Sequence, residues 1–88
     1  MKPLTDTMRE RLNGALDYVL AEERKGTAAA EIIDGMVRNH RAGYGQRNGG
    51  SVYHLRCAGA NTTTTNTDPR VLIITWRRNA VIRLGQML

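Results

Sequence analysis

Phenylalanine is absent from this chain of 88 residues, whose aromatic side chains are one tryptophan and three tyrosines. A hydrophobic core must therefore consist of Leu, Ile, Val, Met and Ala, with Trp76 as its expected large anchor. A chain of this length buries one modest core, which predicts a single domain over residues 1–88.

Cysteine and long apolar runs are also scarce. The single cysteine, Cys57, excludes an internal disulfide and shares no zinc-ligand spacing with the two histidines. The longest aliphatic run, 71–74, is far below the roughly 18 residues of a membrane span, and the charged N-terminus is unlike a signal peptide. Cys57 and His54 could meet on a helix, but no orienting acid lies nearby. We therefore expect a cytoplasmic protein that is not an enzyme, with no cofactor, no metal and no membrane partner.

Negative charge is almost confined to the first part of the chain. Residues 1–36 hold five positive and seven negative side chains, a net charge of −2. Residues 37–88 hold eight arginines and a single acid, Asp68, a net charge of +7. Guanidinium groups bind phosphate oxygens and guanine edges, or the carboxylates of an acidic protein. The asymmetry therefore favours an anionic partner.

Two amphipathic helices are predicted before residue 40. Thr7 and Glu10 match a capping box, and apolar residues follow at spacings of three and four, which predicts a helix over about 7–25. Thr27 is placed to cap a second helix over about 27–39, because three alanines follow it.

The next stretch, 40–50, contains four glycines and is expected to be a loop. It lacks the spacing of a nucleotide-binding glycine loop. Its polar residues Arg41, Arg47 and Asn48 could instead lie along a phosphate backbone.

Residues 51–59 can be read in two ways. As a helix, the segment would turn Val52 and Leu55 toward the core. As a strand, it would place the odd-numbered residues 53, 55 and 57 on one face and His54 and Arg56 on the other. Over so few residues, periodicity leaves both readings open.

The order TAAAEII, a linker, GGSVYHLRCAG and a hairpin resembles the winged helix-turn-helix superfamily of DNA-binding domains. The resemblance spans residues 7–76 and is carried by Thr27, Glu31, Ile32, Ser51, Val52, Tyr53, Leu55 and Gly59. It implies a recognition helix at about 51–58 followed by a two-stranded wing.

A hairpin is predicted over about 60–76. The threonine run favours a polar strand, Asp68-Pro69 is a turn signal, and 71–76 carries the strongest strand signal of the chain. Residues 80–84 could pair back as a last strand, whose exposed edge could join two copies as a homodimer. The predicted fold class is α+β. It is either a small winged helix (α-α-α-β-β with a third strand) or an ααβββ domain with a three-stranded antiparallel sheet.

Two functions are predicted. The first is a small winged-helix transcriptional regulator that contacts duplex DNA through residues 51–56 and an arginine-rich face. The second is a protein-binding module or inhibitor of the phage or mobile-element type, which would use its arginines on an acidic protein surface. The residues expected to bind nucleic acid are Arg41, Arg47, Asn48, Ser51, Tyr53, His54, Arg56, Thr64, Asn66, Arg70, Arg77 and Arg78.

Overall fold

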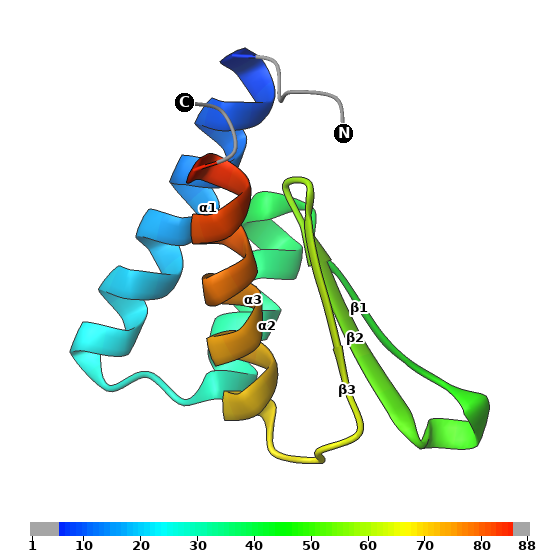
Figure 1. The fold of residues 1–88 in the computed structure, drawn as a ribbon. Coiled ribbons are helices and arrows are strands. Elements are labelled where there is room, and N and C mark those ends of the chain that lie inside the picture. The colour runs from blue at the N-terminus through cyan, green and yellow to red at the C-terminus, as the bar shows by residue number, and fades with distance from the viewer. Residues whose placement is uncertain (1–5, 86–88) are drawn as a thin grey trace.

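The computed structural model describes residues 6–85, which form an α+β fold of three α-helices and a three-stranded antiparallel sheet (Figure 1). The elements are, in chain order, α1 (Asp6–Lys25), α2 (Ala29–His40), β1 (Gly43–Arg47), the 3-10 turn η1 (Asn48–Gly50), β2 (Val52–Cys57), β3 (Ala60–Thr64) and α3 (Pro69–Gly85). The helices and the sheet agree with the predicted α+β class and are compatible with the ααβββ alternative, to which α3 is added.

The elements form layers, with all the helices on one side of the sheet (Figure 1). Helix α3 lies along β3 and β2, α2 contacts β1, and α1 packs against α2 and α3. The predicted anchor Trp76 is fully buried, and its indole N–H donates a hydrogen bond to the carbonyl of Ala60 at 3.1 Å. This bond fixes α3 to the first residue of β3.

The segment predicted as a recognition helix, about 51–58, contains a strand, β2, and not a helix. β2 pairs with β1 from Val52 to Arg56 and with β3 from Tyr53 to Cys57, both antiparallel. Tight turns on either side, at 48–51 and 58–59, return the chain so that β2 forms the centre of the sheet. Leu55 and Cys57 lie on one face, as the strand reading predicted, and this face is buried beneath the helices. The recognition helix at 51–58 is therefore wrong.

The expected loop at 40–50 contains β1. Glycine is a weak strand former, but the register Gly43↔Arg56 and Gly45↔His54 supplies a complete partner strand. Cross-strand pairing thus overrides the local preference of this stretch for a loop.

The predicted strands at 71–76 and 80–84 are both wrong, because the two segments form the single helix α3. Leu72, Trp76 and Ala80 are buried at helical spacing. Asp68 caps the helix by accepting a hydrogen bond from the Arg70 N–H at 2.9 Å, and Pro69 occupies the first helical position, where its missing N–H costs nothing. The wing return strand and the dimerisation edge that these segments implied do not exist.

The two threonine caps are also corrected. α1 begins at Asp6, so Thr7 lies within its first turn. α2 begins after Ala28, which makes no side-chain cap, while the Thr27 hydroxyl donates to a carboxylate oxygen of Glu22 at 3.4 Å.

The β2–β3 turn contains a residue in an unfavourable backbone conformation. Ala58 has φ 52° and Gly59 has φ 90°, and positive φ at both positions is typical of a type I′ turn, which favours Asn-Gly. We expect Ala58→Asn to raise the free energy of unfolding by about 0.5–1 kcal/mol, because asparagine adopts the left-handed conformation with less strain. Denaturant titration measures the change. Ala58→Val is the matched control and should destabilise the fold, and equal stability of the two variants would contradict the turn assignment.

Candidate nucleic-acid interface

One face of the sheet is covered by no element of the described chain (Figure 1). Because side chains alternate along a strand, this face carries the residues that neighbour the buried ones in β2 and β3, together with the β1 residues that pair with them. We call it the open face, and it comprises Gly43, Gly45, Arg47, Val52, His54, Arg56, Asn61 and Thr63.

The open face combines positive charge with neutral hydrogen-bonding groups. Arg47, on the edge strand, and Arg56, on the central strand, are exposed. Arg56 lies between Gly43 and Asn61 in the sheet register, and His54 lies between Gly45 and Thr63. The open face has no carboxylate, since none of its residues is acidic.

His54 lies against the backbone of β1 because its neighbour has no side chain. A Cβ placed on Gly45 would come within 2.9 Å of the His54 Cε1 atom. The Nδ1 atom of this ring is buried and has no hydrogen-bond partner.

The sheet also separates the only thiol from this histidine. Cys57 points to the helices while His54 points to the open face, so the pair cannot act as nucleophile and base. The Cys57 Sγ donates to the His40 carbonyl at 3.5 Å, and burial raises the pKa of the thiol to about 11. Cys57 is thus a neutral core residue at ordinary pH.

Three of the predicted interface residues meet on the open face, namely Arg47, His54 and Arg56. Tyr53 and Thr64 pair with each other on the opposite face, toward the helices. The sequence-based prediction missed Asn61 and Thr63, which alternate with Thr62 and Thr64 along β3 and pair with Arg56 and His54. Strict alternation along β3 would have found both, once 60–64 was placed beside a strand at 52–57.

The remaining predicted residues lie away from the open face. Ser51 is in a turn, Asn66 lies in the connection between β3 and α3, Asn48 is in η1, and Arg41 follows α2. Asn66 accepts the Asp68 N–H at 2.8 Å, which makes it part of the connection to α3. Arg78 is exposed on α3.

Two predicted arginines are bound to carboxylates. Arg70 contacts Asp68 at 2.8 Å, and hydrogen bonds from Arg70 hold the pKa of the Asp68 carboxyl below its usual value. Arg77 donates from Nη1 to both carboxylate oxygens of Glu23, at 2.7 and 2.9 Å, and so joins α3 to α1. Both arginines stabilise local structure in place of binding a ligand on the sheet.

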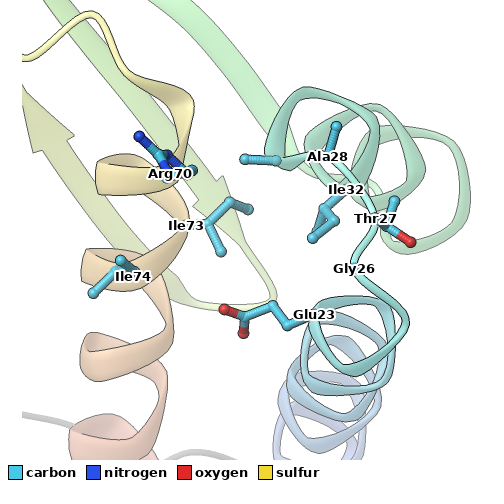
Figure 2. A pocket seen from close by; sticks show the side chains of 9 residues that line it. Glu23, Gly26, Thr27, Ala28, Ile32, Arg70, Ile73 and Ile74 are labelled. Carbon is cyan, nitrogen blue, oxygen red and sulfur yellow. The ribbon is translucent and has the colours of Figure 1, made fainter.

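An apolar pocket lies between the helices, where Ile73 of α3 faces Ile32 of α2 (Figure 2). Glu23 and Arg70 stand at its edges (Figure 2). Glu23 is paired with Arg77 and Arg70 with Asp68, so both charged residues at this pocket already have a partner of opposite charge. No cluster of three potential metal ligands exists between residues 6 and 85, nor is any helix there long and apolar enough to cross a membrane.

Comparisons with protein-family models, curated proteins and solved structures give no match to this chain. The class defined by its own geometry is a small α+β domain that covers one face of a three-stranded sheet with helices and leaves a basic face open.

The contact between His54 and Gly45 can be tested with two glycine variants. We expect Gly45→Ala to push the imidazole off β1 and shift the NMR signal of the His54 Cε1 proton, because the added methyl would overlap the ring. Gly43→Ala is the matched control, since nothing lies within 4 Å of its Cβ position. An unchanged His54 signal in Gly45→Ala would show that the ring does not rest on β1.

The Glu23–Arg77 pair should contribute to stability. Its side chains are only 29% and 35% exposed, so Arg77→Gln is expected to lower the free energy of unfolding by about 1 kcal/mol. Chemical denaturation checks this, and high salt should narrow the difference from the wild type. Arg78→Gln, on the exposed side of the same helix, should leave stability within about 0.5 kcal/mol of the wild type.

Proposed function

We propose that this protein binds duplex DNA through the open face of its sheet. The observation that carries the proposal is the presence of Arg47, His54 and Arg56 on two neighbouring strands, with no carboxylate among the open-face residues. Such a surface attracts the phosphate backbone and also presents donors at fixed positions. A role in transcriptional regulation would follow from sequence-specific binding.

The sheet suits a duplex better than a single strand. The major groove is about 12 Å wide, and the three strands of the sheet, about 4.8 Å apart, span about 10 Å between the outer two. Single-strand binding relies on aromatic stacking platforms, whereas the open face carries no tyrosine or tryptophan. A duplex groove therefore fits both the shape and the chemistry of this surface.

The residues have distinct expected roles. We expect Arg56, on the central strand, to contact a guanine edge, while Asn61 beside it has the amide that can pair with adenine. We expect Arg47, at the end of the edge strand, to bind a phosphate. In this proposal, alternate residues of β2 and its neighbouring strands make the contacts that a recognition helix makes in a winged-helix domain.

An acidic protein surface is the second candidate partner, and one observation favours it. β1 is an edge strand that pairs only with β2 in the described chain. An edge of this kind can accept a strand from another protein, and Arg47 would then lie close to the carboxylates of that partner.

Arg56→Ala tests the proposal. We expect it to weaken binding to a preferred duplex by about 1–3 kcal/mol and to relax the preference at one base pair, because a bidentate guanine contact is lost. Arg47→Ala should weaken binding to all duplexes by a similar factor. It should also reduce the slope of log affinity against log salt concentration by about the value of one phosphate contact. Fluorescence anisotropy over a range of salt concentrations measures both effects.

Arg78→Ala is the matched control, since it removes an exposed arginine on the opposite side of the molecule. Equal losses from Arg56→Ala and Arg78→Ala would mean that net charge alone governs binding. If no duplex binds but an acidic polypeptide does, with the same dependence on Arg47 and Arg56, the acidic-protein reading replaces the DNA reading.

A further inference from the structure

A basic hollow of about 440 Å³ lies at the end of the sheet where the β2–β3 turn meets the helices. It is lined by Arg11 of α1, by Asn39 and His40 of α2, by Arg41 and by Ala58 of the turn. We call it the Arg11–Arg41 pocket. Two arginines, a histidine and an asparagine, contributed by α1 and by the end of α2, thus line one hollow, and no acidic residue is among them.

Arg41 is held in a conformation that arginine rarely adopts. It has φ 56° and ψ 34° at the position after α2, where glycine is the usual residue. The Ala42 N–H closes the helix end by donating to the Met36 carbonyl at 3.2 Å, so the turn requires this backbone geometry. A glycine would adopt this backbone conformation with less strain. An arginine that is kept in a strained conformation where it lines a basic pocket points to a functional role.

The Arg11–Arg41 pocket favours an anion even though it lies at the C-terminal end of α2, where exposed carbonyl groups would repel one. A helix C-terminus carries partial negative charge on its last carbonyls. Here the Met36 carbonyl accepts the Ala42 N–H, and the His40 carbonyl accepts the Cys57 thiol. The ring of His40 lies 5.1 Å from that of Tyr18, which restrains its orientation at the pocket.

We propose that the Arg11–Arg41 pocket binds a phosphate group. Two guanidinium forks provide the paired N–H donors that match phosphate oxygens, and Asn39 and His40 can add further donors. The phosphate can belong to a nucleic-acid backbone or to a free phosphate monoester. The inference rests on this pocket alone and not on DNA binding by the open face.

The sheet register shows how a phosphate from a nucleic-acid backbone can be distinguished from a free phosphate monoester. Arg41 lies two residues before Gly43, which pairs with Arg56 at one end of the open face. A backbone that crosses the open face could therefore continue toward the Arg11–Arg41 pocket. A free phosphate monoester would occupy the pocket without contacting Arg56.

Inorganic phosphate is the first probe. Its binding is monitored at constant ionic strength through the NMR signals of the arginine side-chain N–H groups. We expect saturable shifts at Arg11 and Arg41 and about tenfold weaker binding for Arg11→Gln. Arg38→Gln, in the last turn of α2 but outside the pocket, should bind phosphate as the wild type does. Non-saturating shifts, or equal losses in Arg11→Gln and Arg38→Gln, would overturn the site.

Arg41→Gly separates binding from folding. It should raise the melting temperature, since glycine relieves the positive φ, while it weakens phosphate binding about tenfold. A stable Arg41→Gly variant with unchanged phosphate affinity would contradict the proposal.

Duplex DNA then identifies the source of the phosphate. If Arg11→Gln weakens both phosphate and duplex binding, the pocket holds the backbone of the duplex. If phosphate binds but duplex DNA neither binds nor competes, the pocket serves a free phosphate monoester and the proposed function of the open face fails separately. Absence of phosphate binding with intact duplex binding would reject the pocket and leave the open face standing.

Discussion

The burial of α3 against one face of the sheet is the constraint on which the rest of the structure depends. The Trp76 indole fills the space between this helix and β3, and its N–H is satisfied by the Ala60 carbonyl. In a chain without phenylalanine, this single ring supplies most of the aromatic volume of the core. Because α2 and α3 already cover the inner face and α1 packs on them, the opposite face stays open.

The open face follows from this packing through the alternation of strand residues. Leu55 and Cys57 must point inward, so His54 and Arg56 point outward. The glycines of β1 then matter for what they lack, because a side chain on Gly45 would displace the imidazole of His54. Core packing and the chemistry of the surface are thus set by the same register.

Sequence reasoning located the helices before residue 40 and the buried tryptophan, because helical periodicity and a scarce aromatic residue are strong signals. It failed over 71–84, where β-branched residues resemble a strand but Asp68 and Pro69 begin a helix. It also missed β1, since only the partner strand makes a glycine-rich segment extended. Of the candidate site, the sequence identified Arg47, His54 and Arg56, but the face they share required the strand register.

The positions of the arginines also change the meaning of the charge asymmetry. Arg70 and Arg77 belong to the +7 part of the chain, yet each is bound to a carboxylate and contributes little to an external field. In contrast, Arg47 and Arg56 lie on the open face, and Arg41 joins Arg11, which the charge count had assigned to the acidic part. Net charge counted along the sequence therefore overestimates the contribution of Arg70 and Arg77 to the basic surface and overlooks that of Arg11. What would attract a polyanion is the convergence of arginines from different segments at the sheet, and this convergence arises only when the chain folds.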